Sequence, residues 1–197
     1  MPHRAEKSKK KINIKTLSFG CRLNALESEK IAKSLSGIIN TAILVNTCSV
    51  TGEAERQSAQ AVRKLSRENP NVIIFVTGCG ATRNPGLFAK IPHVIVIDNR
   101  DKMDMHAYVR ALNQAKFNIA CPKIDIFKNS ESALSKKFVQ VQNGCDHDCT
   151  YCVTRLLRGK SFSFPYSEIL NEVKSATNNG FFEIVLTGVD TASYVKL

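Results

Sequence analysis

Three cysteines within eight residues are the part of this sequence that could most directly carry chemistry. They are Cys145, Cys149 and Cys152. Thiolates spaced four and then three residues apart can turn toward one point from a single short loop, as an iron–sulfur cluster or a soft metal ion requires. Three ligands leave a four-iron cubane one ligand short. Either a distant cysteine supplies the fourth bond, or one iron stays open to bind a small molecule.

Two other arrangements suit the same spacing, namely a zinc knuckle or one disulfide with a thiol left over. Residues 1–11 are basic and carry no apolar signal region, and no apolar run approaches membrane-spanning length. We therefore expect a protein of the reducing cytoplasm with no membrane association. Cysteines bind metals there more often than they form disulfides, which favours a metal centre.

The elements that must position the thiols follow from hydrophobic periodicity. Strand-type and helix-type segments alternate over residues 12–117, which predicts a three-layer α/β domain with a mainly parallel sheet. Thr51 is predicted to cap one helix, and Asn24 with Glu27 to form a capping box that opens the helix before it. The predicted strands are 12–19, 41–45, 72–76 and 94–97, and helices are predicted from about 24, over 51–68 and over 102–114.

A second set of three cysteines follows these strands. Cys21, Cys48 and Cys79 each lie just past the end of a predicted strand, at separations of 27 and 31 residues. Because parallel strands end at one edge of a sheet, these thiols should converge, and Gly20 and Gly78 would let the backbones approach closely. A single buried cysteine would mean little, since cysteine is among the most buried residue types. Three at equivalent strand ends favour a second cluster.

Net charge points to a polyanionic partner. Lysine and arginine number 28 against 17 acidic residues, which gives +11 and makes RNA the natural candidate. Arginines at helical spacing on 51–68 form one stripe, and further cations follow the cysteine loop. An ordinary solvated helix face is the alternative. The proposed RNA contacts are Arg56, Arg63, Arg67, Arg155, Arg158 and Lys160.

The segments around both cysteine sets resemble one known family. Cys145-x3-Cys149-x2-Cys152, with Tyr151 at a usual aromatic position, is similar to the radical S-adenosylmethionine (SAM) superfamily. Residues 19–29, 46–51 and 77–80 resemble the three signature segments of the methylthiotransferase amino-terminal domain. The sequence departs from the family pattern at Thr154-Arg155, where an apolar residue and proline are usual, and at Phe162, where a basic residue is common.

The resemblance implies cofactors and their ligands. Two 4Fe–4S clusters would be held, one by Cys21, Cys48 and Cys79, and the other by Cys145, Cys149 and Cys152, whose open iron would chelate SAM. Tyr151 and Gly188 are implied cofactor contacts, with a tight turn as the alternative explanation of Gly188. An external electron donor is also implied, while Cys121 matches no ligand position.

The resemblance also implies an activity. It is closest to the branch that adds a methylthio group to C2 of N6-threonylcarbamoyladenosine beside the tRNA anticodon. The alternatives are methylthiolation of isopentenyladenosine in tRNA, methylthiolation of a ribosomal-protein aspartate, and a non-catalytic iron–sulfur or RNA-binding remnant. The last alternative arises because about sixty residues cannot close a barrel.

The expected domain order has four parts. Residues 1–11 form a basic disordered arm, and 12–117 form the amino-terminal three-layer parallel-sheet domain. Residues 118–136 are a linker, and 137–197 are the start of an incomplete radical SAM (β/α) barrel. The sequence is therefore expected to be truncated at its carboxyl end relative to the family.

Overall fold

A four-stranded parallel sheet is the centre of the first part of the protein. The computed structural model describes residues 13–115 and 136–195. The sheet has the order β1-β2-β3-β4, so each new strand is added beside the one before it. Its strands are β1 (Asn13–Ser18), β2 (Thr41–Thr47), β3 (Ile74–Gly78) and β4 (Val94–Val96).

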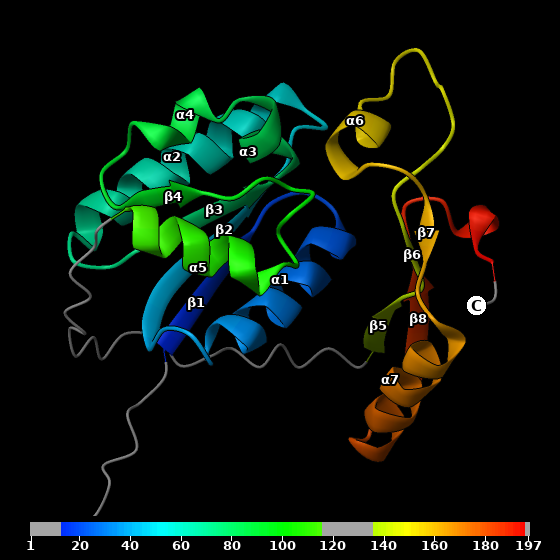
Figure 1. The fold of residues 1–197 in the computed structure, drawn as a ribbon. Coiled ribbons are helices and arrows are strands. Elements are labelled where there is room, and N and C mark those ends of the chain that lie inside the picture. Colours follow the sequence, from blue (N-terminus) through cyan, green and yellow to red (C-terminus); the bar gives the residue numbers. More distant parts are fainter. Residues whose placement is uncertain (1–12, 116–135, 196–197) are drawn as a thin grey trace, which may run out of the picture.

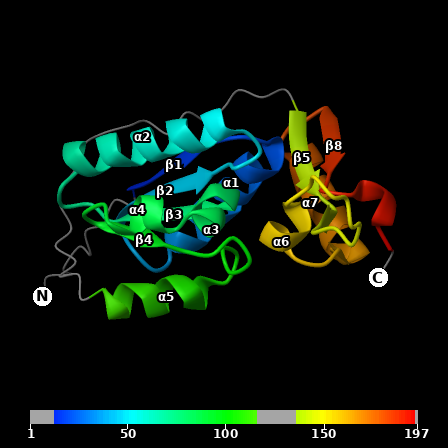
Figure 2. The same ribbon diagram turned by 90° about the horizontal axis from the view of Figure 1, so that it is seen from above.

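Helices cover both faces of this sheet, which confirms the predicted three-layer α/β domain (Figures 1 and 2). On one face, Ile31 and Leu35 of one helix and Tyr108 of another pack against Leu44 and Phe75 of the sheet. The other face holds a second apolar cluster around β2 and β3. The helices are α1 (Arg22–Leu35) and α5 (Met105–Gln114) on the first face, and α2 (Gly52–Glu68), α3 (Cys79–Arg83) and α4 (Gly86–Ala89) on the second.

The two predicted helix starts turn out differently. The Thr51 hydroxyl accepts a hydrogen bond from the Ala54 amide at 3.2 Å, so this cap is confirmed. The capping box of Asn24 and Glu27 is wrong, because α1 already begins at Arg22 and both side chains lie buried within it. Their polar groups serve tertiary contacts instead of the helix end.

The second part of the protein is one strand–helix–strand unit with an attached loop. β5 (Lys136–Gln140) pairs in parallel with β8 (Glu183–Thr187), and α7 (Tyr166–Asn178) connects them through a small core of Val139, Val141 and Ile169. This unit is the expected beginning of a (β/α) barrel. The remaining elements are β6 (Gln142–Asn143), α6 (Thr154–Arg158), β7 (Phe162–Ser163) and the short 3₁₀ helix η1 (Thr191–Ser193).

Some predictions concern residues outside the ranges that the structure describes. The arm at 1–11 lies outside the described residues, as does the linker with Cys121, apart from Lys136, which already begins β5. Among the helices of 13–115 and 136–195, none has the length and apolar character needed to cross a bilayer.

The two parts pack against each other along α1 (Figure 2). The Arg22 guanidinium lies 5.2 Å from the centre of the Phe138 ring, and Lys30 Nζ lies 2.9 Å from a Glu172 carboxylate oxygen. Farther along, Lys137 Nζ lies 3.7 Å from a carboxylate oxygen of Glu29. The face of α1 turned away from the sheet is therefore a contact surface for the second part.

Candidate metal centres

The first three cysteines lie at one edge of the sheet. Cys21 precedes α1, Cys48 directly follows β2, and Cys79 is the first residue of α3 after β3. The strands pair in parallel, with Ser18 opposite Asn46 and Thr47 opposite Gly78. The expected convergence at the carboxyl ends of the strands is therefore present.

Two glycines permit this convergence. Gly20 has φ of +89°, and a Cβ there would lie 2.5 Å from the Cys48 sulfur. Gly78 has φ of +96°, and its Cβ would lie 2.3 Å from the Thr47 carbonyl oxygen. Only glycine combines that backbone conformation with that closeness, so both positions are required for three adjacent strand ends to meet.

The pKa of Cys79 depends on the other two thiols of the first set and on two nearby cations. Burial raises the pKa of Cys79, the cations Arg158 and Lys102 oppose this shift, and Cys48 and Cys21 raise the pKa further. Cys48 and Cys79 are buried, whereas Cys21 is exposed. Together they form a mostly enclosed thiol site beside positive charge.

Buried polar atoms surround the same site. Asn46 Oδ1, Ser49 Oγ and Thr77 Oγ1 are enclosed and have no hydrogen-bond partner within the described part of the chain. Such atoms are rare unless an ion, water or cofactor satisfies them. Two of these atoms are hydroxyl oxygens, which can donate hydrogen bonds to the sulfurs of a cluster. Three thiols beside such donors suit an iron–sulfur cluster, because hydrogen bonds are among the features that tune such centres.

The second three cysteines lie on the loop between β6 and α6. Cys145 is half-buried, while Cys149 and Cys152 are exposed. The Cys152 amide donates to the Cys149 carbonyl at 3.1 Å, and the Cys145 amide donates to the Gly159 carbonyl at 3.2 Å. These bonds fold the loop back on itself and leave Cys149 and Cys152 open to solvent.

Thr154 forms a hydrogen bond with the Cys152 thiol. Its hydroxyl lies 3.1 Å from the Cys152 sulfur, and hydrogen bonding by Thr154 lowers the pKa of that thiol. Proline at the next position is usual in the resembled family, and Arg155 stands there instead. The Arg155 guanidinium lies 3.1 Å from the Asp148 carboxylate.

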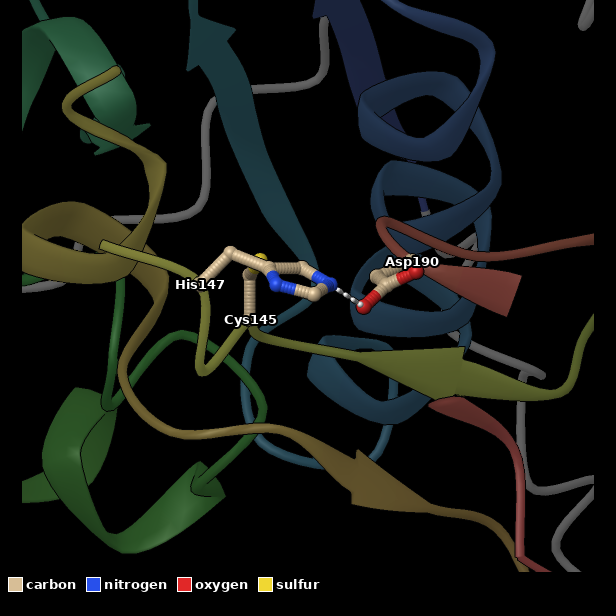
Figure 3. Close-up of side chains that lie close together, drawn as sticks. All are labelled: Cys145, His147 and Asp190. Carbon is tan, nitrogen blue, oxygen red and sulfur yellow. Dashed lines mark ion pairs between the residues drawn. The ribbon is translucent and has the colours of Figure 1, made fainter. Parts of the chain in front are cut away.

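Sequence reasoning missed one group of possible ligands. The ligand atoms of Cys145, His147 and Asp190 all lie within 4.8 Å of one another. His147 Nε2 lies 3.1 Å from a carboxylate oxygen of Asp190. Figure 3 shows these two side chains facing each other. The available signal was the position of Asp190 just beyond β8, because parallel strands β5 and β8 end on the same side.

Neither cysteine triplet is gathered that tightly within residues 13–115 and 136–195. A cubane binds each thiolate to a different iron, so its ligands stand farther apart than those of a single ion. Within the described residues, neither triplet therefore forms a ready-made single-ion site.

Tyr151 and Gly188 have contrasting surroundings. The Tyr151 side chain is 88% exposed on the cysteine loop. A Cβ on Gly188 would lie 2.9 Å from Gln142 Oε1, the same oxygen that accepts hydrogen bonds from the amides of Val189 and Asp190. Close packing against Gln142 accounts for this glycine, and its contact with a cofactor stays a prediction.

Five of the six proposed RNA contacts are exposed. Arg56, Arg63 and Arg67 lie on the outer surface of α2, although Arg56 already pairs with Glu53 at 2.8 Å. Arg155 and Lys160 are exposed beyond the cysteine loop.

The prediction that Arg158 contacts RNA is wrong. Its guanidinium is buried and lies 2.9 Å from the carboxylate of Glu27, so it cannot reach RNA phosphates. Its charge and its place just beyond the cysteine loop suggested a surface role for it. Hydrogen bonds of its side chain to Glu27 and Asn24 of α1 give it a buried place instead.

Two family models match separate stretches of the chain. Residues 11–98 match the model of uncharacterized protein family UPF0004, and residues 139–197 match the radical SAM superfamily. The threonylcarbamoyladenosine tRNA methylthiotransferase MtaB of Rickettsia prowazekii is 43% identical over 188 residues, covering 90% of this chain and 44% of that protein.

Two further relatives are more distant. MtaB of Thermotoga maritima is 31% identical over 95% of this chain and 46% of its own length. The tRNA-2-methylthio-N(6)-dimethylallyladenosine synthase of Thiobacillus denitrificans is 33% identical over 94% of this chain and 46% of its own length. The chain thus spans less than half the length of the curated relatives it matches.

The strand–helix–strand unit, its cysteine loop and the second match define a radical SAM protein, a class that implies a 4Fe–4S cluster and SAM. The preceding three-cysteine domain narrows this assignment. The chain belongs to the methylthiotransferase family of radical SAM enzymes.

Proposed function

We propose that the protein is a tRNA methylthiotransferase acting on N6-threonylcarbamoyladenosine. The observation that carries the proposal is the pairing of two cysteine sets, one enclosed at the sheet edge and one open on a loop, in a chain whose relatives act on tRNA. The preference for this nucleoside rests on the printed name of the 43% identical relative. Isopentenyladenosine is the second candidate, because a 33% identical relative is named for that type of nucleoside.

The cysteines would hold two cofactors. Cys145, Cys149 and Cys152 would bind the cluster that meets SAM, with Tyr151 and Gly188 beside it. Cys21, Cys48 and Cys79 would bind the second cluster. When bound, these groups supply a carbon radical and the transferred sulfur. An external donor would provide the electrons, as expected for an enzyme of the reducing cytoplasm.

The protein's own contribution is enclosure and positioning. Burial of Cys48 and Cys79 keeps water from one centre, whereas exposure of Cys149 and Cys152 leaves the other accessible to a small molecule. Arg63 and Arg67 of α2, with Arg155 and Lys160, are exposed cations suited to tRNA phosphates. Such contacts orient an RNA without reading its sequence.

The test is turnover by the 197-residue chain after anaerobic reconstitution, with SAM, a reductant and tRNA that lacks methylthio groups. Mass spectrometry should detect 5′-deoxyadenosine and a 2-methylthio nucleoside. Two tRNAs, one carrying threonylcarbamoyladenosine and one isopentenyladenosine, decide between the substrates. The Cys149→Ala variant is the control and should form neither product. Absence of both products from the unaltered chain would favour the non-catalytic alternative.

A further inference from the structure

A buried ion network joins the two parts of the protein beside the first cysteine set. Lys102 Nζ lies 2.5 Å from one carboxylate oxygen of Glu27, and an Arg158 nitrogen lies 2.9 Å from the other. Glu27 comes from α1, Lys102 precedes α5, and Arg158 ends α6. The side chains of Glu27, Lys102 and Arg158 are 1%, 2% and 5% exposed. Solvent therefore contributes little to balancing these charges.

The network carries an excess of positive charge. With Lys102 protonated, one carboxylate faces one ammonium and one guanidinium, so the sum is one positive charge. Burial lowers the pKa of Lys102, and Glu27 opposes that shift. A buried charge without a counter-charge is strongly unfavourable. Burial disfavours the charged form of Arg158, but Glu27, Cys79 and Cys21 outweigh burial and raise its pKa. Anionic ligands of the first cysteine set would supply the missing negative charge, because Arg158 reaches the backbone beside Cys21 and Cys48 through Asn24.

Arg158 also supports the backbone around these cysteines. It donates to the Asn24 side-chain oxygen at 2.8 Å, and the Asn24 amide nitrogen donates to the carbonyls of Phe19 at 3.0 Å and Thr47 at 3.1 Å. Those carbonyls lie in the chain just before Gly20-Cys21 and Cys48. A third acceptor, Asn143 Oδ1, lies 3.0 Å from Arg158. This planar fork reaches three side chains in a fixed geometry, which the single nitrogen of a lysine does not reproduce.

We propose that Arg158 is a positioning residue and counter-charge for the centre at Cys21, Cys48 and Cys79, so that docking of the second part completes the metal site of the first. The inference rests on the proposed second cluster. It assigns to the radical SAM part a role in holding that cluster, in addition to its own cysteine loop.

The experiment isolates the first site in the full chain. In a Cys145→Ala, Cys149→Ala, Cys152→Ala background, iron taken up anaerobically reports on Cys21, Cys48 and Cys79. Arg158→Met is the test substitution, since it leaves Glu27 paired with Lys102 and creates no orphan carboxylate. Arg155→Met is the matched control, because Arg155 lies on the same helix, is exposed and pairs with the exposed Asp148. The measurement is the rate of iron loss to a chelator.

Arg158→Met should speed iron loss by about 10-fold or more, because removing the residues that support metal ligands commonly has an effect of this size. Arg155→Met should leave the rate of iron loss unchanged. Equal rates for Arg158→Met and the unaltered background would overturn the inference. Hydrogen exchange of β2 and β3 shows whether the sheet stays folded. If Arg158→Met unfolds it, Arg158→Lys decides, with an intermediate rate expected and an unchanged rate overturning the proposal.

The two proposals fail in different ways. Failure of the background protein to take up iron would remove the second cluster and this inference with it. Uptake by the background, with no effect of Arg158→Met, would remove only the role of Arg158.

Discussion

Arg158 and Glu27 are 131 residues apart in the sequence, yet their side chains meet at 2.9 Å in the interior. One belongs to the helix that follows the exposed cysteine loop, and the other to the helix that follows Cys21. This pair therefore links the two segments that carry the cysteine sets. Their spacing along the chain alone does not reveal this link.

Removing the carboxylate of this pair should destabilise the protein strongly. Glu27→Gln leaves Lys102 and Arg158 buried together without a negative partner, which should lower the free energy of unfolding by about 3–5 kcal/mol. Urea denaturation followed by circular dichroism measures the change. Glu29→Gln is the control, because Glu29 is exposed and its pair with Lys137 is 3.7 Å long, so a change of about 0.5 kcal/mol or less is expected. Equal effects would contradict the structural role of Glu27.

Gly20 should not tolerate a side chain. In Gly20→Ala, the new Cβ would lie 2.5 Å from the Cys48 sulfur at a positive φ, so we expect a loss of about 2 kcal/mol or more and weaker iron binding. Gly52→Ala is the control, because no atom lies within 4 Å of a Cβ there and the residue is helical. That substitution should be neutral or stabilising in thermal melts. A Gly20→Ala protein as stable as the control would refute the close approach.

Thr154 should govern the reactivity of Cys152. Because hydrogen bonding by Thr154 lowers the pKa of Cys152, its thiolate forms at lower pH than that of an ordinary cysteine. Thr154→Val should move the midpoint of the alkylation-rate profile of Cys152 to higher pH and slow alkylation below that midpoint. Mass spectrometry of the metal-free protein with iodoacetamide gives the profile, and Cys149 in the same sample is the internal control. An unmoved midpoint would exclude this hydrogen bond as the cause.

The exposed arginines of α2 should contribute to RNA binding through phosphates. Replacing Arg56, Arg63 and Arg67 by alanine should flatten the slope of log K against log salt by about two to three units. Lys33→Ala, on the exposed side of α1, is a single-charge control away from the stripe and should leave the slope unchanged. Filter binding of tRNA across a salt series measures it. If the triple variant keeps the original slope, the stripe is an ordinary solvated helix face.

Local sequence determined the first sheet and the edge where three cysteines meet. Apolar periodicity and the Thr51 cap depend on neighbouring residues, and parallel strands necessarily end at one edge, so Cys21, Cys48 and Cys79 could be placed without coordinates. The glycines before Cys21 and Cys79 were informative for the same reason, because a positive φ is a local requirement.

Only the tertiary structure decided what Asn24, Glu27 and Arg158 do. Their residue types suited a capping box and an RNA contact, since amides and carboxylates cap helices and arginines bind phosphates. In the folded protein, the Arg158 side chain meets Asn24 and Glu27 of α1, and all three are buried together with Lys102. Which charges become buried partners depends on contacts between segments more than a hundred residues apart, and no local pattern encodes such a pairing.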